Sequence, residues 1–295
     1  MTITAEPQAK PGPPSALTNP DTGHRWYIHP VTGERFISVT TVLSHIAKFG
    51  LTDWAARLAA QAAFDNLPML NRASRQPLCN STRTDDACGN CRDCVTYWLA
   101  DRHNAERDAA AERGTKLHDA AEHTILHGPG VHVDEDAKPL VDQWYRWYDR
   151  YRPEFLATEI TVISRKWGYG GTLDAILRFT EQSRLPKRLA HLTGLPLVDD
   201  YKSSRNVYLT NGWQVGAYAN ADAVLLPDGT EQPMPEIKGG LIVHIRPERV
   251  QMREAYLTEA NFAYFVHMCR VVEGLAAPLN SVLSRPVTMT MKEAN

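Results

Sequence analysis

The run Leu197–Ser204 constrains the fold of this chain more than any other segment. It begins as an apolar strand, reaches the carboxylate of Asp200, and places the ammonium of Lys202 two residues later. Residues i and i+2 of a β-strand point to the same face, so the two side chains are expected to project side by side. The segment therefore predicts a sheet that presents a carboxylate and an ammonium together at the end of one strand.

A second carboxylate stands in another strand-like run, where Asp174 lies within Gly171–Leu177. Mg²⁺ prefers oxygen ligands and keeps several waters, so one or two carboxylates suffice to bind it. We therefore expect Asp174 and Asp200 to bind Mg²⁺ or Mn²⁺ beside a phosphate. Lys202 would orient or deprotonate the attacking water, or stabilise the charge that develops on the phosphate. The alternative is a surface salt bridge, since Asp-x-Lys is a short pattern that also occurs by chance.

Hydrophobic periodicity divides the chain into a mainly helical first half and a second half that contains most of the strands. Helices are expected over 95–127, 136–151, 210–226 and 258–275, and strands over 25–28, 35–39, 158–163, 171–179, 195–201 and 241–246. The predicted class is α/β, with a central mixed sheet flanked by helices. The expected organisation is a disordered tail (1–20), a hairpin and helical region (21–157) with a cysteine insertion (79–94), and a sheet with flanking helices (158–295). These parts are expected to pack as one unit.

Composition sets only broad limits on function. The 295 residues are 43% hydrophobic and 22% charged, as in globular proteins with a proper core. The net charge of -2 neither supports nor excludes nucleic-acid binding, because a local basic patch can attract a polyanion. The chain has no apolar run long enough to cross a membrane, and Met1–Pro20 lacks the apolar core of a signal peptide. We expect a cytoplasmic protein without a membrane partner.

Three polar side chains on predicted helices are further candidates for the site. His118 follows Arg113-Gly114-Thr115 and is a candidate metal ligand through its neutral imidazole, or simply a packed or solvated residue. Gln214 and Tyr218 stand at i and i+4, so they share one helix face. That face is expected to contact Lys202, the water or the nucleic-acid backbone, and the alternative is an ordinary helix surface.

Four cysteines lie within one short polar segment, as Cys79, Cys88, Cys91 and Cys94. In a cytoplasmic chain this density predicts a metal site rather than disulfides. The segment lacks hydrophobic periodicity, so a metal would supply the cohesion that an apolar core does not. Zn²⁺ bound by four thiolates is expected, with a 4Fe–4S cluster as the alternative. Cys269 falls among apolar residues of the last predicted helix and is expected to be a buried small hydrophobe.

Four short motifs occur in a fixed order over about residues 41–246. They are Arg113-Gly114-Thr115-x-x-His118, Gly171-Thr172-Leu173-Asp174, Asp200-Tyr201-Lys202 and Gln214-x-x-x-Tyr218. Together they resemble the PD-(D/E)XK nuclease superfamily, most closely its RecB-type branch with CRISPR-associated and phage-encoded exonucleases. Each motif alone is weak, and their order makes the resemblance specific.

The resemblance implies a restriction-endonuclease-like core and a role for each motif residue. The implied metal ligands are His118, Asp174, Asp200 and the backbone carbonyl of Tyr201. Lys202 is the implied catalytic lysine, and Gln214 and Tyr218 form the accessory motif of the branch. Glu159 stands where related chains often carry an acidic residue near the site, although a charge exposed at a strand start is an equal interpretation. Some relatives hold an iron–sulfur cluster with cysteines on both sides of the core, whereas the four cysteines here lie together.

The implied function is that of a divalent-metal-dependent DNA exonuclease in recombination, repair, or phage or CRISPR DNA processing. DNA with free or single-stranded ends is the expected substrate, in a bacterial or phage-infected cell, with a recombination or replication protein as a candidate partner. Phosphate contacts are expected from Arg113, Lys116 and Arg205. The aromatic residues near the motifs are interpreted as base-stacking or, for most of them, core residues; they are Trp167, Tyr169, Tyr208 and Trp213.

Three alternatives remain open from sequence. The first is a non-catalytic nucleic-acid-binding or assembly module that keeps the nuclease fold, and the second is a structure-selective endonuclease. The third is a cysteine-metal interaction protein in which the Asp-x-Lys pattern is incidental. This last interpretation predicts that Asp174, Asp200 and Lys202 do not converge in space.

Overall fold

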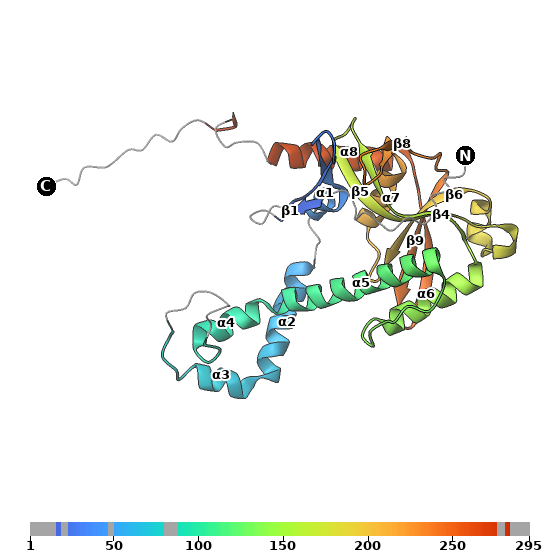
Figure 1. Cartoon of the computed structure of the whole chain (residues 1–295). Helices are drawn as coiled ribbons and strands as arrows, with labels where there is room; N and C mark the ends of the chain where they lie inside the picture. Colours follow the sequence, from blue (N-terminus) through green and yellow to red (C-terminus); the bar gives the residue numbers. More distant parts are fainter. Residues whose placement is uncertain (1–15, 19–22, 47–49, 80–87, 276–280, 284–295) are drawn as a thin grey trace.

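A computed structural model describes residues 16–18, 23–46, 50–79, 88–275 and 281–283 of the chain (Figure 1). Within the segment predicted to be a disordered tail, residues 16–18 form a short strand that pairs with the next strand of the sheet. The rest of that predicted tail, and the middle of the predicted cysteine insertion, lie outside the described residues.

Ten strands form one mixed sheet in the described part of the chain. They are β1 (Ala16–Thr18), β2 (Arg25–Ile28), β3 (Arg35–Ser38), β4 (Glu154–Ser164), β5 (Tyr169–Arg178), β6 (Pro196–Lys202), β7 (Ala223–Leu225), β8 (Glu231–Pro233), β9 (Gly239–Arg246) and β10 (Arg249–Ala255). The pairs β3–β5 and β6–β9 are parallel. The antiparallel pairs are β1–β2, β2–β3, β4–β5, β4–β7, β5–β6, β7–β8 and β9–β10. The predicted mixed sheet is therefore confirmed, and the predicted β2–β3 hairpin belongs to it.

The sheet branches at β5, and this branch positions the candidate site. One edge of β5 pairs with β4 along most of its length. The other edge pairs first with β3, through Ile37–Tyr169 and Ser38–Gly170, and later with β6, from Ala175–Asp199 onward. Between these two stretches, residues 171–174 of β5 form no pairing with a described strand on that edge. A gap therefore opens between β5 and β6 at the height of Asp174.

The described part contains eight α-helices. They are α1 (Val39–Ser44), α2 (Leu51–Asp65), α3 (Leu67–Ala73), α4 (Arg92–Ala100), α5 (Arg102–His127), α6 (Lys138–Tyr151), α7 (Leu209–Ala219) and α8 (Glu259–Leu275). Two short 3₁₀ helices, η2 (Glu181–Ser183) and η3 (Lys187–Leu192), join β5 to β6. None of the helices in these ranges has the length and apolarity needed to cross a bilayer.

Helices cover both faces of the sheet, each over its own apolar cluster. On one face α1, α7 and α8 pack through residues such as Val42, Val215 and Phe265. On the other face α5 and α6 pack through Leu117 and Trp144. Figure 1 shows α5 and α6 running side by side below the sheet, with α8 above it. The predicted arrangement of a sheet flanked by helices is thus confirmed.

The helices next to the cysteine cluster stand away from the sheet. In Figure 1, α2, α3 and α4 form a separate lobe at the far end of α5. This lobe has almost no apolar core: α2 buries no residue, α3 buries Ala73, and α4 buries Cys94 and Val95. Such short helices are marginal in water without tertiary packing, so the lobe needs another source of cohesion.

Candidate functional site

The gap between β5 and β6 brings the two predicted aspartates together. The ladder between these strands ends at the Ala175–Asp199 pair, and Asp174 and Asp200 are the next residue on each strand. Directly opposed residues of an antiparallel pair have Cβ atoms about 5 Å apart. The interpretation in which the Asp-x-Lys pattern is incidental required these groups to lie apart, and their convergence contradicts it.

Asp174 lies at the centre of the cluster and is bonded on both oxygens. Its Oδ2 accepts a hydrogen bond from the backbone N–H of Tyr201 at 2.6 Å, and its Oδ1 lies 3.2 Å from His118 Nδ1. Burial acts to raise the pKa of the Asp174 carboxyl, but His118, Lys202 and the Tyr201 N–H together lower it. Asp174 is therefore ionised. Since the N–H and C=O of one strand residue point to the same side, the Tyr201 carbonyl also faces the gap.

His118 reaches this carboxylate from α5. Its ring packs edge-on against the Tyr201 ring, with centroids 5.9 Å apart. Burial acts to lower the pKa of His118, but the Asp174 carboxylate outweighs it and raises the pKa to about 9. At Gly114 the helix comes close to the residue that follows β6, where an added Cβ would lie 3.2 Å from Ser203 Oγ. The absence of a side chain at Gly114 therefore allows α5 to lie close enough to the sheet for His118 to reach Asp174. His118 and Lys202 both line a cavity of about 260 Å³ at this point.

Glu159 joins the cluster from β4, although the sequence motifs alone did not assign it a role. One ligand atom from each of His118, Glu159 and Asp174 lies within 4.8 Å of the others, so the three can hold one metal ion. The β4–β5 register pairs Thr158 with Ala175 and Ile160 with Leu173, which sets Glu159 opposite Asp174. Its φ of 48° is uncommon for a non-glycine residue and marks local strain of the kind found at functional sites.

Asp200 and Lys202 form a buried ion pair beside this cluster. Lys202 Nζ lies 2.8 Å from Asp200 Oδ1, to which it donates a hydrogen bond, and 2.7 Å from Oδ2. The geometry at Oδ2 does not make a hydrogen bond, and this buried oxygen accepts none from the described residues. Burial raises the pKa of Asp200 to about 6, against the opposing effect of Lys202. Burial acts to lower the pKa of Lys202, but Asp200 and Asp174 raise it overall, so Lys202 is an ammonium.

The neighbouring acidic residue, Asp199, points to the opposite face of the sheet and is fully buried. Burial, followed by the charges of Asp174 and Asp200, raises its pKa well above the usual value. On this same face the Tyr201 ring packs against Trp144 and Trp147 of α6, each with centroids 6.1 Å away. Alternation along β6 therefore separates Asp200 and Lys202, in the gap, from Asp199 in the apolar layer.

The accessory residues Gln214 and Tyr218 lie on one face of α7, as their spacing predicted. Gln214 Nε2 donates to the Tyr218 hydroxyl at 3.1 Å. The Tyr218 ring is buried against Gly171 of β5, where an added Cβ would come within 2.5 Å of Cε1. Burial raises the pKa of Tyr218 well above its usual value, and the charges of Asp200 and Asp174 act in the same direction. Tyr218 therefore stays a neutral phenol near the two carboxylates.

The predicted phosphate-binding cations differ in their surroundings. Lys116 forms ion pairs with Glu112, Asp134 and Asp136, at 3.0 to 3.1 Å. This pairing does not favour a phosphate contact for Lys116. Arg113 is half-buried on α5 and Arg205 is exposed after β6, and neither forms an ion pair with an acidic side chain in the described part.

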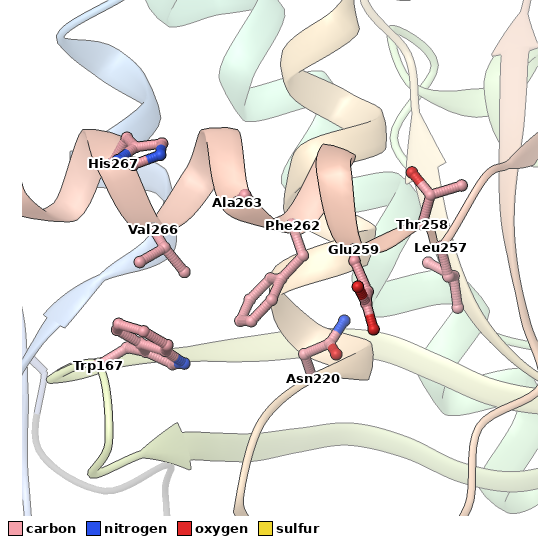
Figure 2. Close-up of a pocket in the computed structure, with 9 residues that line it drawn as sticks. All are labelled: Trp167, Asn220, Leu257, Thr258, Glu259, Phe262, Ala263, Val266 and His267. Atoms are coloured by element: carbon pink, nitrogen blue, oxygen red, sulfur yellow. The ribbon is translucent and has the colours of Figure 1, made fainter.

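The predicted base-stacking aromatics divide in the same way. Tyr169 is fully buried, and Trp167 packs against Phe262 of α8 with centroids 6.4 Å apart. Figure 2 shows both rings of that pair facing a cavity of about 320 Å³ beside α8. The described residues that line this cavity include no member of the candidate site. The core interpretation therefore fits Trp167 and Tyr169, whereas Tyr208 is exposed.

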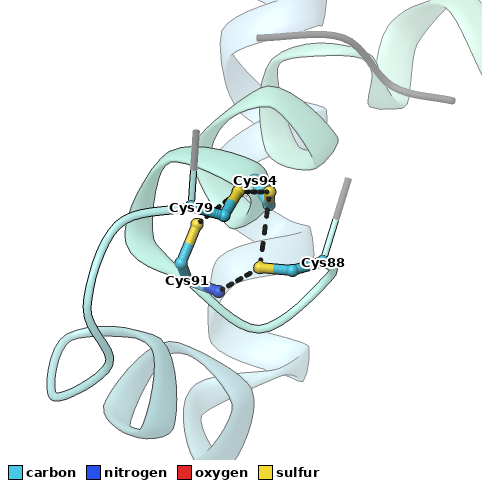
Figure 3. Close-up of side chains that lie close together, drawn as sticks. All are labelled: Cys79, Cys88, Cys91 and Cys94. Carbon is cyan, nitrogen blue, oxygen red and sulfur yellow. Dashed lines mark hydrogen bonds between the residues drawn. The ribbon is translucent and has the colours of Figure 1, made fainter. Parts of the chain in front are cut away.

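The four cysteines of the insertion gather at one point, as predicted (Figure 3). Cys79 Sγ lies 3.3 Å from Cys94 Sγ and 3.5 Å from Cys91 Sγ, and the Sγ atoms of Cys88 and Cys94 are 3.7 Å apart. Hydrogen bonds with the backbone at Cys79 and Cys94 lower the pKa of the Cys91 thiol to about 6. The cluster can bind a metal ion such as zinc.

The spacing of these sulfurs bears on which metal fits. A tetrahedral zinc ion with Zn–S distances of about 2.3 Å holds its sulfurs about 3.8 Å apart. The Sγ–Sγ separations of 3.3 to 3.7 Å in the cluster are close to this value. This arrangement is compatible with a metal ion such as zinc.

Comparisons with known proteins do not identify a family. Neither the family models nor the curated proteins give a match. One solved structure, the crystal structure of SSO0001, is 14% identical, with 81% of this chain and 84% of that chain covered at a TM-score of 0.30. A likeness this distant carries no argument about fold or function.

Proposed function

We propose that this chain is a divalent-metal-dependent DNA nuclease with a PD-(D/E)XK core of the RecB-like type. The observation that carries the proposal is the convergence of Asp174, Asp200 and Lys202 in the gap between β5 and β6. Paired carboxylates with an adjacent ammonium suit metal-assisted hydrolysis of a phosphodiester. Preference for DNA ends, as an exonuclease, follows from the sequence resemblance and is part of the same proposal.

The residues present fit a hard divalent cation. Asp174, Glu159 and His118 offer three ligand atoms close together, and Asp200 contributes a buried oxygen that accepts no hydrogen bond from the described residues. Together with the Tyr201 carbonyl, this set matches the preference of Mg²⁺ and Mn²⁺ for oxygen with an occasional imidazole. When bound, the ion supplies Lewis acidity toward the scissile phosphate.

Lys202 acts through its charge in this proposal. The carboxylates of Asp200 and Asp174 raise the pKa of Lys202 and favour its ammonium form. A fixed ammonium beside the reacting phosphate stabilises the negative charge that develops there, and it costs no reorganisation during the reaction. Asp200 holds Lys202 in place through the buried ion pair. Gln214 and Tyr218 line the same region from α7 and orient the strand or the lysine.

The cysteine lobe has a structural role in this proposal. We infer that Cys79, Cys88, Cys91 and Cys94 bind Zn²⁺ as four thiolates, which closes the coordination shell and leaves no site for substrate. The ion would then hold α2, α3 and α4 together in place of an apolar core.

Cleavage of labelled DNA with and without divalent metal tests the proposal. Single-stranded DNA, linear duplex and closed circular DNA are incubated with Mg²⁺, Mn²⁺ or a chelator, and a labelled RNA of the same sequence serves as a further arm. Metal-dependent release of nucleotides from open ends is expected. We expect Asp174→Asn to abolish cleavage and Lys202→Ala to reduce its rate by about 10²- to 10³-fold.

Asp119→Asn is the matched control, because Asp119 is an exposed aspartate on α5 next to His118. This variant should cleave at the wild-type rate. Cleavage of closed circles would favour a structure-selective endonuclease, and metal-independent binding without product would favour a non-catalytic module. Undiminished cleavage by purified Asp174→Asn would refute the metal assignment.

A further inference from the structure

A third cavity, distinct from the candidate site and from the cavity beside α8, lies on the α6 side of the sheet. It has a volume of about 750 Å³ and is formed by α6, η3 and β10. Four of its lining residues are arginines, namely Arg146, Arg150, Arg188 and Arg253. We call this cavity the arginine pocket. Its lining shares no residue with the proposed metal and lysine cluster.

The charge of the arginine pocket is largely uncompensated. None of the four arginines forms an ion pair with an acidic side chain of the described residues. The single carboxylate in the lining, Glu254, lies 3.1 Å from His191 Nε2. Arg146 and Arg150 stand at i and i+4 on α6, where like charges destabilise a helix. An anionic ligand would relieve this repulsion, so the pocket favours negative charge.

Aromatic side chains share the same cavity. Tyr256 lines it and is 68% exposed, which leaves its ring face available for stacking. Arg150 lies over the Tyr151 ring, with Cζ 5.6 Å from the centroid, and the buried ring of Trp147 also lines the pocket. Guanidinium groups bind phosphate through two parallel hydrogen bonds, and aromatic faces stack on nucleobases without regard to sequence.

We propose that the arginine pocket binds the phosphate groups of a nucleotide, with Tyr256 against its base. The volume lies within the range of small-molecule sites, about 300 to 1,000 Å³. The nucleotide is either free or part of a nucleic-acid strand, since both carry the same phosphate and base chemistry. The inference stands independently of the nuclease proposal, because it uses different residues and requires no divalent metal.

Calorimetric titration of the full chain in the presence of a chelator tests this inference. ATP is the free-nucleotide probe, and oligothymidylate is the strand probe. The test variant is Arg146→Gln with Arg150→Gln, and a second pair, Arg188→Gln with Arg253→Gln, repeats the test if the first does not fold. The matched control is Arg72→Gln with Arg75→Gln, which removes the same charge from exposed positions in the cysteine lobe.

We expect each pocket pair to raise the dissociation constant at least tenfold, because each removes two charge-assisted phosphate contacts. The control pair should change it less than twofold. Tyr256→Ala should weaken binding and Tyr256→Phe should retain it, since phenylalanine keeps the stacking face. Loss of ATP binding identifies a free-nucleotide site, and loss confined to oligothymidylate identifies a strand site. Failure of both probes to bind, or equal losses in the pocket and control pairs, would overturn the proposal.

Discussion

Removal of the metal from the four cysteines should unfold the cysteine lobe and leave the sheet folded. The helices α2, α3 and α4 have 15, 7 and 9 residues. Their buried side chains are Ala73, Cys94 and Val95, besides the cysteine at the N-cap of α4. Isolated helices of this length are marginal in water. We therefore expect the lobe to depend on a metal ion at the four thiolates rather than on apolar burial.

The size of the effect follows from that dependence. Structural zinc contributes about 10 to 16 kcal/mol of binding free energy at pH 7 in small zinc-binding peptides. Complete burial of one valine side chain contributes only about 1.5 to 3 kcal/mol, so Val95 cannot replace the ion. The chelated lobe should be unfolded outright rather than weakened. The sheet has its own clusters on both faces and should keep its stability.

Hydrogen exchange measured by peptide mass spectrometry separates the two parts. Addition of a strong chelator should abolish protection in 51–73 and 92–100 and leave β5, β6 and β9 unchanged. Elemental analysis should find one zinc per chain, and an absorbance spectrum of anaerobically purified protein should lack iron–sulfur bands. Cys91→Ser should reproduce the effect of the chelator, whereas Cys269→Ser, a buried cysteine of α8, should retain the metal. Unchanged protection in 51–73 after verified metal loss would refute the reasoning.

Three further predictions concern the sheet. Gly171→Ala should destabilise the fold by about 1 to 3 kcal/mol in urea denaturation, because its Cβ would meet the buried Tyr218 ring at 2.5 Å. Glu159→Gly should relieve the strained φ and raise the unfolding free energy by about 1 kcal/mol. The same variant should bind Mn²⁺ more weakly in calorimetry, and an unchanged Mn²⁺ affinity would exclude Glu159 as a ligand. Asp199 has a raised folded-state pKa, so its stabilising contribution is complete below its unfolded pKa and is lost as pH rises toward the folded value. Asp199→Asn cannot ionise, and its unfolding free energy relative to the parent should increase with pH by up to about 1.4 kcal/mol per unit above about pH 4; a difference independent of pH would contradict this.

The period-2 pattern of β-strands made the core of the candidate site predictable. Because Asp200 and Lys202 are two residues apart, their shared face required only that the segment be a strand. Asp174 needed one further assumption, namely that its strand is the neighbour of β6, and the ladder from Ala175–Asp199 onward satisfies it. The four cysteines were predictable because their spacing within one polar segment leaves few alternatives to a metal site.

Other features depend on contacts that no local pattern encodes. Glu159 enters the cluster through a left-handed backbone conformation and its register opposite Asp174. Lys116 is sequestered by Asp134 and Asp136, which belong to the connection after α5. The expected helix over 210–226 ends at residue 219, and β7 follows because Val224 pairs with Val162 of β4. Tertiary pairing overrides local propensity there.

The buried charges around Asp174 are difficult to explain by stability alone. Desolvation of an ion pair often exceeds its Coulombic gain, and well-packed apolar residues in the same volume are commonly as stable or more so. Here Lys202, Asp174 and Asp200 lie where apolar side chains could have filled the same space. Two residues further along the same two strands, the buried apolar pair Ile176 and Val198 does so. The strained backbone of Glu159 adds a further cost at the same place. These costs fall together on one cluster of oxygen and nitrogen donors, which supports the proposal that the cluster has a chemical function rather than a structural one.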